Sequence, residues 1–272
     1  MVRWIGLAGV VAALALVPAA GAAFPAPYAQ QGDPGVLGKG GTVRFVAYDA
    51  GESTRLVALK QTTGKVMQSQ MIQGSFGIPV IANRTNGEGL FRNGRSIMLQ
   101  SVGVKTATSF EIVSTLDLAV QDSFTLPGTF SYDALSPNGE TLFLTEHKSV
   151  QDVQHYVVRA YDIAQHQLRP YQIADKTQKN WVMQGWPAAR VTSADGRWVY
   201  TLYANPGGVP FVHALDTVKA VAHCVGIRPP STDQSQLFGY RLSLKGSKLL
   251  VRTASGATYR AINRTTWKVT AR

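Results

Sequence analysis

The fold of this chain is decided by the stretch Ser136-Pro137-Asn138-Gly139-Glu140-Thr141-Leu142-Phe143-Leu144. Its Asn-Gly pair is typical of a tight turn between two strands, because both residues tolerate the positive φ angles that such turns require. Three consecutive apolar residues follow the turn. They indicate a strand that is buried on both faces, since a strand with one wet face alternates apolar and polar residues. The stretch therefore predicts a hairpin whose second strand lies inside the protein.

The same pattern recurs along the chain. Its turn glycines are Gly94, Gly139, Gly196 and Gly246, which are 45, 57 and 50 residues apart. Each glycine is followed by an apolar strand, a further β-rich segment, a second turn and another strand. No stretch longer than about ten residues has a helical period. Four strands repeated about every 40–50 residues are typical of the blades of a β-propeller.

The predicted fold is therefore all-β: a propeller of about five four-stranded blades, in a ring that is either closed or open. Residues 42–72 supply only three strands, so we expect the first blade to be incomplete and the amino-terminal strand to close the ring against the last blade. Both faces of an inner strand should be covered by neighbouring blades. Phe143, Tyr200 and Leu250 should then occupy corresponding positions between successive blades.

The amino terminus predicts export. Arg3 precedes an apolar run that ends near Val17, and small residues follow Pro18, as in a secretory signal peptide. We therefore divide the chain into a signal peptide (1–23), a flexible linker rich in Pro and Gly (24–41) and the propeller (42–272). The alternative is an uncleaved membrane anchor, because the uncharged run continues past Phe24 and is just long enough to span a bilayer. Either reading places the protein outside the cytoplasm, in the cell envelope or the extracellular space.

The charge balance favours anionic surroundings. The chain has 27 Lys and Arg residues against 16 Asp and Glu, a formal net charge of +11. Such a charge favours association with anionic polymers or surfaces. The basic residues form no run of five and no aromatic-basic motif, which argues against specific nucleic-acid binding. The expected partner is a protein or a polysaccharide of the cell envelope, and a membrane only if the amino-terminal segment is not cleaved.

The turn motifs resemble those of bacterial secreted β-propeller repeats of the YVTN and WD40-like kind. In those repeats a Ser-Pro-Asp-Gly-like turn precedes an apolar strand, and a later strand ends in Asp before the next turn. The matching pairs in this chain are Ser136-Pro137-Asn138-Gly139 with Tyr161-Asp162, and Ser193-Ala194-Asp195-Gly196 with Leu215-Asp216. The resemblance covers residues 42–272 and implies the fold. Propellers serve as lectins, glycosidases, lactonases and scaffolds, so it implies no activity.

Standard catalytic and metal-binding motifs are absent from the sequence, and no cofactor is expected. Cys224 lies in an apolar strand, which indicates a buried thiol without chemical reactivity. His213 is expected to be a hydrogen-bonded core residue. The repeated Asp117, Asp162 and Asp216 precede turns, where an aspartate side chain accepts hydrogen bonds from backbone amides. We interpret them as turn caps and not as catalytic acids.

The candidate ligand site lies on the innermost strands. The residues six positions before the turn glycines are Glu88, Asp133, Arg190 and Tyr240. Equivalent positions of a propeller form a ring around its axis, so these side chains should line one mouth of the channel. Trp186 should add a stacking surface there. Mixed charges with an aromatic residue suit a polar ligand, whereas the alternative is a merely solvated channel.

Two functions follow. The first is an exported, non-catalytic binding or scaffold protein of the cell envelope. The second is a propeller hydrolase, either a glycosidase or a lactonase, that uses Glu88, Asp133 and Arg190. The hydrolase requires two carboxylates about 5–10 Å apart in a concave site, or a metal ion held by several of them.

Overall fold

The computed structural model describes residues 28–82, 87–175, 177, 182–228 and 231–271. Their regular secondary structure is almost entirely β, with one short 3₁₀-helix among the described residues. The elements are β1 (Tyr28–Gln30), β2 (Val36–Leu37), β3 (Val43–Ala50), β4 (Ser53–Lys60), β5 (Val66–Gln73), β6 (Phe76–Val80), β7 (Ser96–Ser101), β8 (Ala107–Ser114), β9 (Val120–Pro127), β10 (Thr129–Leu135), β11 (Thr141–His147), β12 (His155–Asp162), β13 (Gln167–Ile173), β14 (Met183–Gln184), β15 (Trp186–Thr192), β16 (Trp198–Ala204), β17 (Phe211–Asp216), β18 (Val221–Gly226), the 3₁₀-helix η1 (Ser235–Gly239), β19 (Arg241–Lys245), β20 (Lys248–Arg252), β21 (Thr258–Asn263) and β22 (Val269–Ala271).

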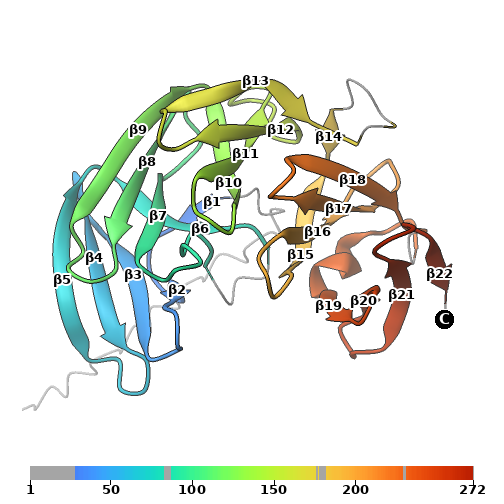
Figure 1. Cartoon of the computed structure of the whole chain (residues 1–272), viewed down its shortest axis with the longest axis horizontal. Helices are drawn as coiled ribbons and strands as arrows, with labels where there is room; N and C mark the ends of the chain where they lie inside the picture. Colours follow the sequence, from blue (N-terminus) through green and yellow to red (C-terminus); the bar gives the residue numbers. More distant parts are fainter. Residues whose placement is uncertain (1–27, 83–86, 176, 178–181, 229–230, 272) are drawn as a thin grey trace, which may run out of the picture.

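The strands form five antiparallel sheets that follow one another along the chain. The first sheet has the order β2-β3-β4-β5, the second β1-β6-β7-β8-β9, and the third β10-β11-β12-β13 with β14 paired to β12. The fourth sheet is β15-β16-β17-β18 and the fifth is β19-β20-β21-β22. The sheets stand side by side in an arc, with the first and fifth at its two ends (Figure 1). This arrangement confirms the predicted propeller blades.

Neighbouring residues of one inner strand enter different cores. In β7, Ile97 and Leu99 pack in a cluster with Leu56 of the first sheet. Met98, which lies between them, packs instead in a cluster with Leu142 of the third sheet. All of these side chains are fully buried. Both faces of the sheet are therefore covered, which explains why the inner strands are continuously apolar.

The three positions expected to be equivalent are only partly so. Phe143 lies in the core between the third and fourth sheets, and Tyr200 lies in the next core, between the fourth and fifth sheets. Leu250 belongs to neither core. It pairs with Ser243 and Ala261 on the other face of the fifth sheet, which no sheet of the described residues covers. The prediction for Leu250 is wrong because the arc ends at this face.

The segment expected to be a flexible linker contributes strands. Tyr28 of β1 pairs with Val80 of β6, and Val36 of β2 pairs with Phe45 of β3. The first sheet is thus completed by β2, and no strand of the amino-terminal region pairs with the last sheet within the described part of the chain. The expected ring closure is corrected accordingly. These short strands are held by main-chain pairing, which leaves no pattern in the side chains.

The predicted hairpin turns are present. Backbone amides of Gly94, Gly139 and Gly196 donate to the carbonyl three residues earlier. The side chain of Asn138 accepts a hydrogen bond from the Glu140 amide. The Asp216 carboxylate likewise accepts from two amides of its own turn, as expected for a cap.

The expected signal peptide lies outside the described residues. Among the residues that are described, no helix has the length and apolar character that crossing a bilayer requires.

Candidate functional site

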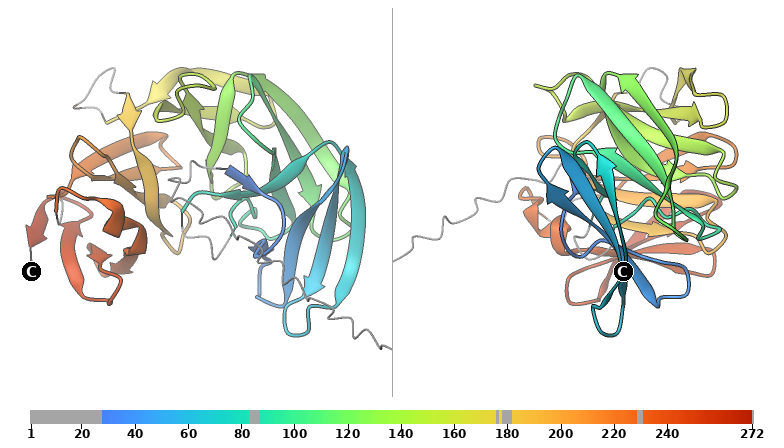
Figure 2. Two further views of the ribbon diagram at one scale, coloured as in Figure 1. Left: turned by 180° about the vertical axis from the view of Figure 1, so that it is seen from behind. Right: turned by 90° about the vertical axis from the view of Figure 1, so that its left-hand side faces the viewer.

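Three of the predicted site residues, one each from the second, third and fourth sheets or the segments that join them, lie close together. Figure 2 shows these sheets side by side in the arc from two further directions. Arg190 of β15 is at the centre. Its Nη1 atom lies 2.8 Å from Oδ1 of Asp133, and its Nε atom lies 3.5 Å from Oε1 of Glu88. Nη1 also donates to Oγ1 of Thr201 at 3.1 Å, and Nη2 donates to the backbone oxygen of Asp133. The ring of equivalent positions therefore brings these three side chains together.

Two β-bulges orient the side chains of Asp133 and Arg190. The pairing of β10 with β11 shifts between Tyr132 and Ala134, so that Asp133 is the extra residue of the bulge. The pairing of β15 with β16 shifts between Pro187 and Ala189, just before Arg190. A bulge bends its strand and redirects the side chains near it. The strand irregularities thus place the carboxylate and the guanidinium face to face.

The pair is deeply buried. The Arg190 side chain is 5% exposed and that of Asp133 is 3% exposed, whereas that of Glu88 is 33% exposed. Burial by itself lowers the pKa of Arg190, but Glu88 and Asp133 together raise it well above its ordinary value. Burial raises the pKa of Glu88, the nearby Asp133 raises it further, and Arg190 opposes both. Arg190 is therefore a fixed cation, and Glu88 is the carboxylate that meets solvent.

A cavity of about 210 Å³ opens beside this cluster. Its polar wall includes Glu88, Arg92, Ser136, Arg190 and Thr192, together with Tyr132. Burial raises the pKa of the Tyr132 phenol far above its usual value, so this side chain stays neutral. Asp133 is not part of the wall, because its carboxylate is turned toward Arg190 behind the cavity surface.

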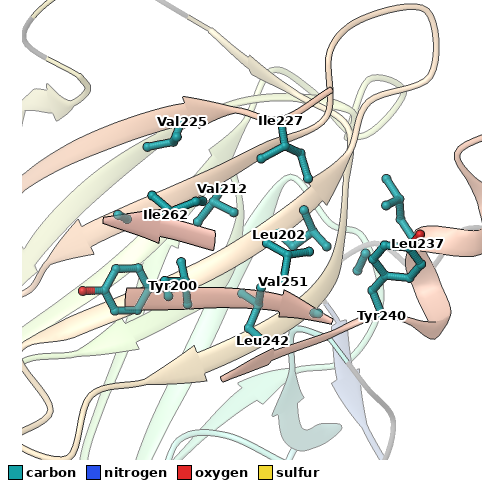
Figure 3. Packing of buried hydrophobic residues seen from close by; sticks show 14 of the residues in the cluster. Tyr200, Leu202, Val212, Val225, Ile227, Leu237, Tyr240, Leu242, Val251 and Ile262 are labelled. Atoms are coloured by element: carbon teal, nitrogen blue, oxygen red, sulfur yellow. The ribbon is translucent and has the colours of Figure 1, made fainter. Parts of the chain in front are cut away.

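Two predicted site residues lie elsewhere. Tyr240 is 5% exposed and packs in the core between the fourth and fifth sheets, next to η1 (Figure 3). Trp186, at the start of β15, is also buried and does not line the cavity. The hairpin at Gly246 is shorter than the others, joining β19 directly to β20. Tyr240, which is six residues before Gly246, therefore precedes β19 and does not lie within it.

The cavity wall also contains polar residues that were not predicted from the sequence. Arg92, Ser136 and Thr192 precede their turn glycines by two, three and four residues. The signal was present, because the turns that define the blades also reach the mouth of the cavity. The cavity is therefore lined both by the innermost strands and by the turns that follow them.

A second buried polar group lies at the opposite end of β10. Nε2 of His147 lies 2.9 Å from Oγ of Ser131, and Nδ1 lies 2.8 Å from the backbone oxygen of Val153. Burial lowers the pKa of His147, which keeps the imidazole neutral. The Nδ1 proton is then donated to the carbonyl and Nε2 accepts from the serine, which is a satisfied core arrangement.

The structure offers few donors for a metal ion. Across the described ranges, no three His, Cys, Asp or Glu side chains are grouped closely enough to hold one. Burial raises the pKa of the Cys224 thiol, and His213 lies beside it with Nδ1 3.5 Å from Sγ.

Comparison with known proteins finds similar solved structures of low sequence identity. The sequence matches no protein-family model and no curated protein. Hydrazine synthase of Kuenenia stuttgartiensis is 13% identical, with 93% of this chain and 79% of that chain covered and a TM-score of 0.45. The Cps50 (Swd1) β-propeller domain of Myceliophteria thermophila is 12% identical over 85% of this chain and 65% of that chain (TM-score 0.46). The Dos1 propeller is 9% identical, with 84% of this chain and 56% of that chain covered and a TM-score of 0.48.

Proposed function

We propose that the protein is an exported, non-catalytic binding protein of the cell envelope, which holds a polar ligand in the cavity beside Glu88 and Arg190. The single observation that supports this proposal is the convergence of polar and charged side chains from the second, third and fourth sheets on one cavity. A concave site with a few fixed polar groups is the usual form of a ligand site. The turn motifs support placing the blades among the secreted YVTN and WD40-like repeats.

Binding is favoured over hydrolysis by the state of the two carboxylates. Glu88 faces the cavity, whereas the Asp133 carboxylate is buried and accepts a hydrogen bond from Nη1 of Arg190, and the Asp133 backbone oxygen accepts one from Nη2. Hydrolysis of a glycoside requires two carboxyl groups on opposite sides of one bond. Of these two carboxyl groups only that of Glu88 faces the cavity, so the cluster serves as a rigid part of the cavity wall.

The wall suits a sugar residue of an envelope polysaccharide. Carboxylate, hydroxyl and guanidinium groups of Glu88, Thr192 and Arg92 offer both acceptors and donors, and Leu90 and Val199 add apolar surface. A sugar ring presents hydroxyl groups at its rim and C–H groups on its faces, which matches such a mixture. A protein segment is the other candidate partner.

Titration calorimetry with oligosaccharides prepared from cell-envelope polysaccharide tests this proposal. We expect at least one oligosaccharide to bind, and Glu88→Gln and Thr192→Val to weaken it by about tenfold each, as expected for a lost polar contact. Glu52→Gln, an exposed change in the first sheet, is the control and should bind normally. Binding that survives both cavity variants would place the ligand elsewhere.

Export is tested separately by mass spectrometry of the protein from its native cell. The small residues before Phe24 support cleavage after Ala22 or Ala23. The expected mature chain then begins at Ala23 or Phe24. A chain that still begins at Met1 would instead indicate an anchored protein.

A further inference from the structure

The positive charge of the chain is concentrated in its last sheet. Residues 234–272 include eight of the 27 Lys and Arg residues and none of the 16 Asp and Glu residues. This segment therefore accounts for eight of the eleven net positive charges of the whole chain. It corresponds to η1 and the fifth sheet.

Four of these cations lie on the face of the fifth sheet that no other sheet of the described residues covers. Arg241 is directly opposite Arg252, and Lys245 is directly opposite Lys248, on the paired strands β19 and β20. Residues that alternate along a strand share one face, so all four lie on the same side as Leu250. The hydrogen bond from Nε of Arg252 to Oγ of Ser243, at 2.9 Å, is made on this face. We call these four residues and their surroundings the basic face.

The basic face is electrostatically unfavourable in the protein alone. Like charges directly opposite on paired strands destabilise a sheet, and two such pairs occur here. Every ion pair found among the described residues lies in the second, third or fourth sheet. Elsewhere the buried Arg190 is paired with Asp133 and the partly buried Arg159 with Glu146. On the basic face the balancing anions must come from outside.

The face lacks the side chains that other anionic partners require. The aromatic ring of Trp267 stacks on His223 of the fourth sheet, with ring centroids 4.4 Å apart, on the covered side. Leu250 is buried. Val269, the large exposed apolar residue of this sheet, pairs with Ile262 of the core and so lies on the covered face. Membrane-surface binding uses inserted apolar residues and single-stranded nucleic acid stacks on aromatic residues. A hydrophilic polyanion needs neither.

We propose that the basic face binds a linear acidic polysaccharide, through carboxylate groups that pair with Arg241, Lys245, Lys248 and Arg252. Lys248 and Arg252 are four residues apart on β20, so the two rows of cations are separated by about 13 Å. Successive carboxylates of an extended chain can engage both rows at once. This surface is distinct from the cavity at the second, third and fourth sheets, and the inference goes beyond the proposed function.

The test uses the mature full chain and polygalacturonate as the probe, with uncharged dextran as the comparison polymer. Affinity is measured by biolayer interferometry from about 50 to about 300 mM NaCl, a range over which screening of exposed charges increases strongly. The quadruple variant Arg241→Gln, Lys245→Gln, Lys248→Gln and Arg252→Gln removes the basic face. The matched control removes two arginines and two lysines elsewhere, Arg55→Gln, Lys60→Gln, Lys65→Gln and Arg95→Gln, all of them exposed.

We expect polygalacturonate to bind with an affinity that falls as salt rises, and dextran not to bind. The face variant should lose at least about tenfold in affinity, and the control should lose less than about threefold. Because removal of opposed like charges relieves repulsion, the face variant should melt no lower than the unmodified protein. Its loss of binding then cannot be ascribed to unfolding.

Three results would overturn the proposal. An equal loss in the control would mean that net charge alone attracts the polymer. Undiminished binding by the face variant would place the contact elsewhere. Stronger binding to vesicles with anionic phosphatidylglycerol than to polygalacturonate would indicate a membrane surface as the partner. Glu88→Gln and Thr192→Val should leave this binding unchanged, so a failure of the cavity proposal is distinguishable from a failure here.

Discussion

Arg190 and Asp133 illustrate how much depends on single residues near the axis. Their side chains are 5% and 3% exposed, and they are held together by a 2.8 Å ion pair. A buried pair contributes little net stability, because each ion loses its hydration. Removal of one partner is costly, since the other charge then remains buried without compensation.

The first prediction concerns this pair. Arg190→Met should lower the free energy of unfolding by about 3–5 kcal/mol, because it leaves the Asp133 carboxylate unpaired. Combining it with Asp133→Leu should recover most of that loss. Urea denaturation followed by circular dichroism measures both. Arg95→Met, on an exposed side chain, serves as a control that should change stability by less than about 0.5 kcal/mol. A cost below about 1 kcal/mol for Arg190→Met would contradict the burial of the pair.

A second residue-scale prediction concerns pH. Burial lowers the pKa of His213 from 6.5 to about 4, and the residue is 2% exposed. A base with a lowered pKa contributes stability above its unfolded pKa, and this contribution is lost as the pH falls. Relative to His213→Gln, the unmodified protein should therefore lose about 3 kcal/mol between pH 6.5 and 4.

Chemical denaturation at several pH values measures this difference. Val104→Thr, an exposed change that involves no titratable group, is the control and should retain the pH dependence of the unmodified protein. A flat difference between His213→Gln and the unmodified protein would show that the imidazole at this position is hydrated.

At the scale of elements, the turn that defines the blades is also where they touch. A side chain at Gly139 would lie 2.8 Å from the ring of Phe91, a buried residue of the preceding sheet. At Gly196 the nearest atom, at 3.1 Å, is the flexible end of Arg92. At Gly246 no atom lies within 4 Å. The three turns are similar in sequence but differ in surroundings.

These differences predict a graded series. All three glycines have positive φ, so an alanine costs about 1–2 kcal/mol at each from backbone strain. Gly139→Ala should cost about 1 kcal/mol more than Gly246→Ala, because the Phe91 ring is packed and cannot move aside. Gly196→Ala should match Gly246→Ala. Thermal melts of the three variants provide the ranking, and equal melting temperatures would contradict the contact with Phe91.

The sequence was informative where side chains alternate between two cores, and silent where the main chain alone makes the contact. The triplet Ile97-Met98-Leu99 predicts a strand covered on both sides, because each side chain needs an apolar partner. In contrast, β1 and β2 have three and two residues and pair through backbone groups. A segment rich in Pro and Gly gives no sign of such pairing.

The candidate site shows the same limit. Equivalent positions in the repeat brought Glu88, Asp133 and Arg190 together correctly. The bulge at Asp133, which buries its carboxylate, depends on the register of β10 against β11. A register is a property of two paired strands and has no signature in either one. The displacement of Tyr240 likewise follows from the length of a single hairpin.

At the scale of the whole molecule, the five sheets are not equally supported. The third sheet has a core on each face, whereas the fifth has one core and one face that no sheet of the described residues covers (Figure 1). Arrays of repeats gain stability from each interface between neighbours. Terminal sheets should therefore open more often than central ones.

Hydrogen–deuterium exchange with mass spectrometry tests this prediction. Amides of β20 and β21 should exchange about tenfold faster than those of β11 and β12, since the fifth sheet lacks one stabilising interface. The outer strands β5, β13 and β18 provide an internal reference for edge effects. Uniform protection across the five sheets would mean that the molecule opens only as a whole.

Completion of the first sheet by β2 has a mechanical consequence. In a closed propeller, a strand from one end of the chain pairs with the sheet at the other end, and this pairing fixes the angles between the sheets. Here no strand joins the first sheet to the fifth among the described residues, although β1 ties the chain before the first sheet to the second sheet. The boundaries between the other sheets can therefore act as a row of hinges. Small rotations at each boundary between neighbouring sheets add up to a large change in the distance between the first and fifth sheets. The cluster of Glu88, Asp133 and Arg190 bridges three of the sheets. A ligand bound beside it would therefore fix the angles between these sheets and, through them, the distance between the first and fifth sheets.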